Sequence, residues 1–314
     1  MTCKRCHHTA RKFGRYGKRR IQRYRCTACK ITFSEYEPKL GTHYTAPETA
    51  AKALAMMLEG MSIRAISRLT GLHQGTILSL MTTAAKRAGA KLDSLVRNVH
   101  VGYVQADEIW TYCQKKERHV RTGDSPEVGN QWAFVALDAE TKLIVSCVIG
   151  KRTAQTTRRF LSDLKSRIAN ARFQLTTDGF HFYERGVEDA FAGQADFAQL
   201  IKLFGDYGQF DTSEARYSPP RISGVISKIR DGRPDPEHIS TSYVERSNLS
   251  FRMHLRRYTR LTNAFSKKLA NLKAAVTLYV AYYNFVRVHR TLRVTPAMEA
   301  GLADHAWSLV ELLA

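Results

Sequence analysis

Long apolar runs are absent from this sequence, although 44% of its 314 residues are hydrophobic. No stretch approaches the roughly 20 consecutive apolar residues that a helix needs to span a bilayer. The opening residues, Met-Thr-Cys-Lys-Arg-Cys, lack the apolar core of a secretion signal. We therefore expect no membrane attachment and a cytoplasmic location, in a chain long enough for two or three domains around a real core.

Acidic residues are scarce in two segments. Residues 1–40 hold 12 lysines and arginines but 2 acids, and residues 245–293 hold 11 but 1 acid. Residues 101–244 are balanced, with 19 of each sign. Solubility alone would not segregate charge in this way. The two basic blocks therefore predict nucleic-acid contacts on either side of a neutral core, and a nucleoid-associated protein. A basic membrane-surface protein is the alternative, but no segment reads as an amphipathic anchor.

Cysteine is also sparse, with six in the chain, but four of the six form two pairs. Cys3-x2-Cys6 and Cys26-x2-Cys29 are nineteen residues apart, which is a zinc-ribbon spacing. Four thiolates suit tetrahedral Zn²⁺, whereas two disulfides are disfavoured in a cytosolic protein. His7 or His8 could replace a cysteine, although exposed polar residues are the simpler reading. We predict a structural zinc module over residues 1–40.

Cations and aromatic residues alternate between the two cysteine pairs. Such hairpins bind the phosphate backbone and can stack on bases. The aromatic residues are Phe13, Tyr16 and Tyr24, and the cations are Arg11, Lys12, Arg15, Lys18, Arg19, Arg20, Arg23 and Arg25.

Residues 41–98 predict a helical domain and a linker. A first helix ends at Gly60, a second covers 62–69, and a third begins at His73 and runs to about Lys86. Residues 86–98 are polar and helical, and we expect them to connect this domain to the core. Two helices joined by a tight turn containing Gly71 form a helix-turn-helix, whose later helix enters the major groove. A three-helix bundle without a DNA role is the alternative. The side chains placed to touch base edges are His73, Gln74 and Thr76.

Residues 99–290 predict an α/β catalytic domain. Three antiparallel strands, a helix, a strand, a helix and a further strand follow in the order of an RNase H-like domain. Their expected ranges are 101–106, 131–138, 143–149, 153–169, 173–177, 180–191 and 197–204. Residues 205–240, rich in Pro and Gly, predict an inserted loop or hairpin. Residues 291–314 are expected to form a C-terminal tail.

Three acids fall where an RNase H-like domain places its carboxylates. Asp107 is expected at the end of the first strand, Asp178 follows the fourth, and Glu245 opens a long helix. A buried carboxylate is costly unless a cation holds it, and two Mg²⁺ or Mn²⁺ ions about 3.5–4 Å apart suit in-line displacement at phosphorus. The structural alternatives are a plain Asp-Gly turn at Asp178 and a capping box ending at Glu245.

Two neighbours of these acids complete the predicted site. Glu108 is expected to point away from Asp107, because neighbours on a strand alternate faces. Asn248 lies one helical turn after Glu245 and is expected to assist the metal or the substrate. The candidate catalytic residues are thus Asp107, Asp178, Glu245 and Asn248, the first three as metal ligands.

The chain resembles transposases of the IS1 family of bacterial insertion sequences, nearly from end to end. The matching segments are Asp107-Glu108-Ile109-Trp110, Thr177-Asp178-Gly179-Phe180, Val244-Glu245-Arg246-Ser247-Asn248, Tyr282-Tyr-Asn-Phe-Val-Arg-Val-His-Arg-Thr-Leu and Thr295-Pro-Ala. The resemblance implies a zinc-binding N-terminus, a helix-turn-helix and a D-D-E domain that cleaves DNA and transfers strands. It also implies double-stranded DNA partners, namely terminal inverted repeats and target DNA, and a homodimer or higher assembly. A basic helix would grip the backbone through Arg252, Arg256, Arg257 and Arg260.

One interval departs from the family pattern. Sixty-six residues separate Asp178 from Glu245, more than in the best-known members, which makes Glu237 the fallback third acid. Two other functions stay open: an inactive DNA-binding regulator encoded by the element, and another RNase H-like nuclease that cuts without joining.

Overall fold

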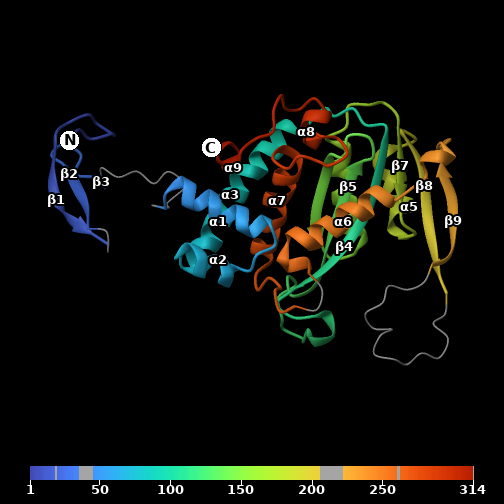
Figure 1. Ribbon diagram of the computed structural model, residues 1–314, viewed down its shortest axis with the longest axis horizontal. Coiled ribbons are helices and arrows are strands. Elements are labelled where there is room, and N and C mark those ends of the chain that lie inside the picture. Colours follow the sequence, from blue (N-terminus) through green and yellow to red (C-terminus); the bar gives the residue numbers. More distant parts are fainter. Residues whose placement is uncertain (18–19, 35–44, 206–221, 260–261, 314) are drawn as a thin grey trace. The chain divides into compact units, whose positions relative to one another are not determined.

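A computed structural model describes residues 1–17, 20–34, 45–205, 222–259 and 262–313. The chain divides into two compact units, Met1–Ala50 and Ala51–Ala314 (Figure 1). Within the described residues, no helix combines the length and apolarity needed to cross a membrane. Lys18, Arg19 and Arg260, which the sequence places on DNA-binding surfaces, lie outside the described residues.

The first unit contains a small antiparallel sheet. Its strands β1 (Ala10–Tyr16), β2 (Ile21–Cys26) and β3 (Thr32–Ser34) pair in that order. Among its described residues before β3 ends, the buried hydrophobic side chains are Cys3, Ala10 and Cys26. A core of this size buries little apolar surface, and small modules of this kind are commonly stabilised by a metal or by disulfides.

Three helices open the second part of the chain: α1 (Pro47–Leu58), α2 (Ile63–Thr70) and α3 (Gln74–Leu95). Gly71 ends α2 with a left-handed backbone, φ 70°, as the sequence turn predicts. The third helix expected to about Lys86 and the helical connector expected after it form one continuous helix, α3. Helix α3 continues because buried Ala85 and Ala88 extend its apolar stripe. That stripe packs along α7 (Leu269–Phe285), with Gly89 permitting close approach to Thr277.

A six-stranded mixed sheet forms the centre of the second unit (Figure 1). Its strand order is β6-β5-β4-β7-β8-β9, in which β4, β7 and β8 are parallel and the other pairs are antiparallel. This α/β arrangement resembles the RNase H-like order expected from the sequence. The strands are β4 (Tyr103–Cys113), β5 (Gly129–Asp138), β6 (Ile144–Gly150), β7 (Phe173–Thr177), β8 (Ala195–Phe204) and β9 (Ile222–Asp231).

Strand β9 belongs to the segment predicted as an inserted loop or hairpin. It pairs antiparallel with β8, from Phe197↔Asp231 to Phe204↔Ile222. The described part of that segment thus contributes one strand, which widens the sheet.

Helices cover the two faces of β4 differently. Val104 and Ala106 belong to the core shared with α4 (Ala154–Lys165) and α5 (Phe182–Phe191). Gln105, one residue out of phase, instead accepts hydrogen bonds from the first backbone amides of α6 (Ser242–His254). The period-two alternation of the strand thus directs even-numbered side chains to α4 and α5 and odd-numbered ones to α6.

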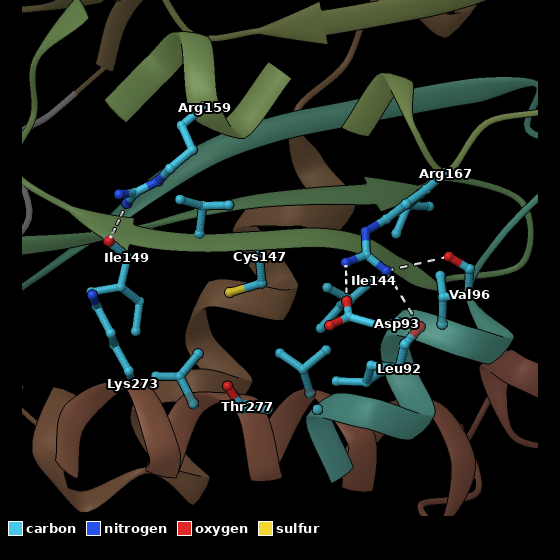
Figure 2. Close-up of a pocket in the computed structure, with 15 residues that line it drawn as sticks. Leu92, Asp93, Val96, Ile144, Cys147, Ile149, Arg159, Arg167, Lys273 and Thr277 are labelled. Carbon is cyan, nitrogen blue, oxygen red and sulfur yellow. Dashed lines mark hydrogen bonds and ion pairs between the residues drawn. The ribbon is translucent and has the colours of Figure 1, made fainter. Parts of the chain in front are cut away.

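The end of α3 is held to the sheet layer by Arg167, which follows α4. Its guanidinium forms ion pairs with Asp93 at 2.7 Å and Asp163 at 2.9 Å. It also donates to the carbonyls of Leu92 and Val96. Figure 2 shows the contacts of Arg167 with the end of α3 beside a cavity of about 320 Å³ between α3, β6 and α7. The segment expected to be a polar connector is therefore an integral part of the second unit.

The predicted C-terminal tail is folded. Helices α8 (Pro296–Glu299) and α9 (Leu309–Leu313) lie within it. Trp307 stacks on Phe285 with ring centroids 4.7 Å apart, and Leu312 is fully buried. Short 3₁₀ helices cover Glu117–His119 (η1), Pro236–His238 (η3) and Arg256–Tyr258 (η4).

Candidate active site

The acids lie where one strand stops beside a longer one. The parallel ladder between β4 and β7 ends at Ala106↔Thr177, while β4 continues alongside β5 to Cys113↔Gly129. Just beyond Ala106, this edge of β4 has no strand partner among the described residues until Cys113 bridges Ser266, and Asp178 is the first residue past β7. The prediction that Asp107 lies at a strand end is wrong. It lies in the middle of β4, at the edge of the opening left by β7.

Three carboxylates converge in this opening. One oxygen each of Asp107, Glu108 and Asp178 lies within 4.8 Å of the others. Glu108 was expected to point away from Asp107, and strand alternation does place it on the opposite face of β4. Because β7 has ended, both faces open onto the same gap, and the carboxylates still meet. Glu108 therefore belongs to the acid cluster, contrary to the sequence-based expectation.

Helix α6 brings the remaining predicted residues to the same place. The amide Nδ2 of Asn248 donates a 2.7 Å hydrogen bond to Oδ2 of Asp107. Glu245 lines a cleft of about 550 Å³ together with Asp107 and Asp178. Its carboxylate pairs with Lys202 and accepts a 2.6 Å hydrogen bond from the Thr241 hydroxyl.

This geometry bears on two alternatives: a capping-box role for Glu245, and Glu237 in place of Glu245 as the third acid. In a capping box, the side chain of the N-cap residue accepts a hydrogen bond from a backbone amide of the first helical turn. The N-cap residue of α6 is Thr241, and its side chain makes no such bond. The fallback acid, Glu237, is exposed in η3 and does not line the cleft. Glu245 thus lines the cleft beside the other acids, outside the cluster of Asp107, Glu108 and Asp178.

Arg152 is the cation that the sequence did not reveal. Its guanidinium lies 3.0 Å from Oε2 of Glu108 and 3.3 Å from Oδ2 of Asp178. The same group is 3.9 Å from the Phe180 ring centroid and 5.0 Å from that of Trp132. An arginine just after β6 carries no motif, so only the fold could show that it meets the acids.

The crowding of buried carboxyl groups in this site raises their pKa values. Burial, then the charge of Asp178, raises the pKa of Asp107 to about 7. The same causes raise the pKa of Glu108 to about 8, and burial raises the pKa of Asp178. Because the pKa values shift toward protonation even with Arg152 and Lys202 nearby, these carboxylates would gain from a further cation.

The donor atoms suit a hard divalent ion. Among the described residues, Oε1 of Glu108 and Oδ1 of Asn248 are buried without a hydrogen-bond partner. The buried Tyr183 hydroxyl lies beside Glu108. Carboxylate and amide oxygens are ligands for Mg²⁺ and Mn²⁺ rather than for softer metals. The residues present therefore fit divalent metal binding.

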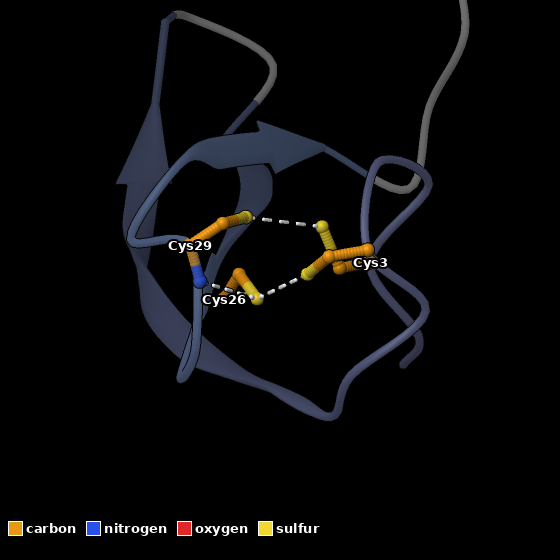
Figure 3. A group of neighbouring side chains, drawn as sticks. Cys3, Cys26 and Cys29 are labelled. Atoms are coloured by element: carbon orange, nitrogen blue, oxygen red, sulfur yellow. Dashed lines mark hydrogen bonds between the residues drawn. The ribbon is translucent and has the colours of Figure 1, made fainter.

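The four paired cysteines form a second cluster, in the first unit (Figure 3). All four are free thiols, with Sγ atoms 3.6 Å apart for Cys3 and Cys29 and 3.4 Å apart for Cys6 and Cys26. Tetrahedral Zn²⁺ with bonds of about 2.3 Å would separate its sulfurs by roughly 3.8 Å. The cluster predicted from the spacing is thus brought together at dimensions that could hold zinc.

The residues predicted to contact DNA base edges lie at the start of α3. Gln74 is exposed and Thr76 is half-buried. His73 is exposed but uses Nδ1 to accept the Gly75 amide at 3.1 Å, which makes it the N-cap. Leu69, near the end of α2, is 64% exposed. The start of α3 thus offers a polar, accessible end beside an exposed leucine.

The predicted basic helix ends earlier than expected, at His254. Arg252 is half-buried near the end of α6, and Arg256 is exposed in η4. Arg257 turns inward, where it donates to Ser266 Oγ at 2.8 Å and lies 3.5 Å from Met81 Sδ. Burial lowers the pKa of Arg257 to about 10. Its guanidinium is therefore engaged within the protein rather than presented to a DNA backbone.

No protein-family model matches the sequence, and no curated protein matches it. Solved structures of transposases do match. A piggyBac transposase synaptic complex with hairpin DNA aligns over 89% of this chain and 72% of its own, with 8% identity and a TM-score of 0.37. A Mos1 transposase paired-end complex aligns over 51% and 61%, with 12% identity and a TM-score of 0.22. The Mos1 strand transfer complex aligns over 72% and 78%, with 11% identity and a TM-score of 0.22.

Proposed function

We propose that this chain is a DNA transposase of a bacterial insertion sequence, of the IS1-like type that its motifs resemble. The observation that carries the proposal is the acid cluster of Asp107, Glu108 and Asp178 in the gap beyond β7, with Glu245 in the same cleft. Buried acids that repel one another and leave oxygen atoms unbonded are arranged for metal binding rather than for folding stability.

Asp107, Asp178 and Glu245 would hold two divalent ions, Mg²⁺ or Mn²⁺, and Glu108 adds a fourth carboxylate to that set. When bound, such ions activate an attacking oxygen and stabilise a leaving one. Asn248 orients Asp107 through its amide, which fixes one ligand oxygen before any ion arrives. Arg152 neutralises Glu108 and Asp178 and lies at the cleft where a phosphate would enter.

The reaction is phosphoryl transfer on DNA in two steps. Water first attacks a phosphorus at the end of the element, which forms one P–O bond and breaks another to free a 3′-hydroxyl. That hydroxyl then attacks a target phosphodiester, joining the strands and expelling a target 3′-hydroxyl. Each step conserves the number of P–O bonds, so the cleft needs no redox partner.

The remaining parts of the chain would select the DNA. Residues 1–40, as a zinc ribbon, and 41–98, as a helix-turn-helix, would bind the terminal inverted repeats. Residues 99–290 form the catalytic domain of this scheme, and residues 291–314 complete it. Exposed Arg256 and half-buried Arg252 would contact the backbone near the cut. A homodimer or higher assembly would hold both ends of the element.

Strand transfer is the test of this proposal. Purified protein is incubated with Mg²⁺ and labelled DNA carrying the inverted repeats that flank its gene, beside Asp107→Ala and Glu245→Ala. Glu237→Ala serves as the matched control, since that acid is exposed and outside the cleft. We expect cleaved and joined products with the parent and the control, and neither product with the two site variants, which still bind DNA.

Each other outcome has a defined meaning. Binding without cleavage, even with Mn²⁺, would replace the proposal with an inactive DNA-binding regulator. Cleavage without joined product would indicate another RNase H-like nuclease. Cleavage that survives Glu245→Ala would move the third ligand to Glu108.

A further inference from the structure

A basic pocket of about 500 Å³ lies beside α6, away from the acids. Four cations line it: Lys142 from the turn between β5 and β6, Arg246 from α6, and Arg287 and Arg290 from the segment after α7. We call this group the basic pocket. Of the residues that the structure describes, no carboxylate lines it.

The basic pocket and the acid cleft occupy opposite sides of the same helix. Successive residues of an α-helix are rotated by about 100°. Arg246, Ser247 and Ser250 of the pocket therefore point roughly away from Glu245 and Asn248. About one helix diameter, roughly 10–12 Å, lies between the two sites. A ligand in the basic pocket is thus not the group that reacts at the acids.

The four cations are not balanced by the protein. Among the described residues, none of Lys142, Arg246, Arg287 and Arg290 forms an ion pair, whereas Arg152, Arg167 and Lys202 all do. Burial, then the charges of Lys142 and Arg287, lowers the pKa of His289 in the same pocket. Four unpaired cations around one hollow are costly by mutual repulsion, which an anion would relieve.

A buried hydroxyl also lacks a partner in this pocket. Ser247 is 3% exposed and lines the hollow, yet its Oγ has no hydrogen-bond partner among the described residues. Native proteins rarely leave a buried polar atom unbonded without a ligand or water to bond it. Tyr243, with Lys142 Nζ 3.3 Å from its ring centroid, and Tyr283 add aromatic walls.

We propose that the basic pocket binds backbone phosphates of DNA at a position remote from the bond that is cleaved. This inference rests on the proposed function, in which DNA is the polyanion that the protein binds. Arginine forks match phosphate oxygens in pairs, and a serine hydroxyl beside them is a common phosphate donor. Because Arg246 belongs to α6, DNA held there bears directly on the helix that presents Glu245 and Asn248.

The salt dependence of DNA binding tests the pocket. Full-length, zinc-loaded protein is titrated with duplex DNA at several salt concentrations, without Mg²⁺ or Mn²⁺ so that no cleavage occurs. The test variant is R246Q/R290Q, since both side chains are exposed and their loss leaves the core intact. The matched control is R158Q/R185Q, two exposed arginines on α4 and α5, 61% and 82% accessible.

Each phosphate contact contributes about 0.9 to the slope of log K against log salt. We expect R246Q/R290Q to reduce the magnitude of that slope by about 2 without changing the melting temperature. The control should leave the slope near the parent value. R287Q, tested alone, should lower the slope by about 1. An unchanged slope, or an equal fall in the control, overturns the proposal.

Inorganic phosphate supplies a second arm. Stabilisation of the parent by millimolar phosphate, absent in R246Q/R290Q and accompanied by an unchanged DNA slope, would assign the pocket to a small anion and overturn the DNA assignment. Failure of strand transfer with a lowered slope would instead reject the catalytic proposal and retain the pocket. The two proposals therefore fail separately.

Discussion

The side-chain amide of Asn248 holds Oδ2 of Asp107 at 2.7 Å, across the gap between α6 and β4. Asn248 is buried and Asp107 is half-buried, and among the described residues the amide oxygen Oδ1 of Asn248 has no hydrogen-bond partner. The contact is therefore a directed one, in which a neutral donor fixes a carboxylate without neutralising it. Asn248 acts on the site through Asp107.

Replacing Asn248 should weaken metal binding more than it weakens the fold. Residues that orient a metal ligand typically account for 10–100-fold in affinity or activity. We expect Asn248→Ala to raise the Mn²⁺ concentration for half-maximal cleavage by about 10–100-fold, with most of the maximal rate recovered at saturation. Asn263→Ala, at an exposed asparagine, is the control and should leave that concentration unchanged. An equal loss of rate at all metal concentrations would count against a positioning role.

The raised pKa values of the acids predict a pH-dependent stability. Asp107 and Glu108 have folded-state pKa values of about 7 and about 8, against ordinary values of 3.8 and 4.5. Between those limits the folded state binds more protons than the unfolded state, so the free energy of unfolding falls as pH rises. Without divalent ions, the melting temperature should decrease from about pH 5 to about pH 8 and then level off.

The same experiment identifies the acids responsible. The variant D107N/E108Q should lose most of the slope, because neither side chain then titrates. E237Q should keep it, since that acid is exposed. Saturating Mg²⁺ should raise the melting temperature most near pH 8, where the carboxylates are ionised. A parent protein whose stability rises from pH 5 to pH 8 would contradict the buried cluster.

Arg152 should stabilise the protein only while the acids lack another cation. Arg152→Gln removes the ion pair of buried Glu108, which we expect to cost about 1–3 kcal/mol after allowing for the partial exposure of the arginine. The loss should shrink near pH 5, where Glu108 is protonated. Thermal melts with and without Mg²⁺ measure this, and the ion should stabilise the variant more than the parent. Identical Mg²⁺ effects in both proteins would mean that Arg152 does not share the cluster with the metal.

Zinc removal should unfold the first unit alone. Its small sheet buries few apolar side chains, whereas the second unit has its own core. Cys26→Ser, or a chelator, should make residues 1–34 sensitive to protease while residues 51–314 remain resistant. Cys147→Ser is the control, because that thiol lies outside the cluster. Loss of protease resistance across the whole chain would show that the units depend on each other.

The sequence predicted the features that are carried by local pattern. Paired cysteines, the strand order and the placement of Asp178 after β7 follow from spacing and periodicity. The length of β4 did not, since Asp107 and Glu108 interrupt the apolar run that marks a strand. Glu108 lies in the site because β7 ends early, and Arg152 lies in it because β6 ends nearby. Such contacts depend on where strands end relative to one another, which a single sequence does not encode locally.

The shortness of β7 has a consequence for engineering this chain. Its five residues end opposite Ala106, so Asp107 and Glu108 have no strand partner on that side among the described residues, and β4 is next bridged there at Cys113 by Ser266. The opening at the acids thus exists because β7 ends there, and the length of β7 sets its width. Two more residues paired along β4 would hide the carboxylates behind a continuous ladder. Insertions after Thr177 should therefore abolish metal access while leaving every acidic side chain in the sequence.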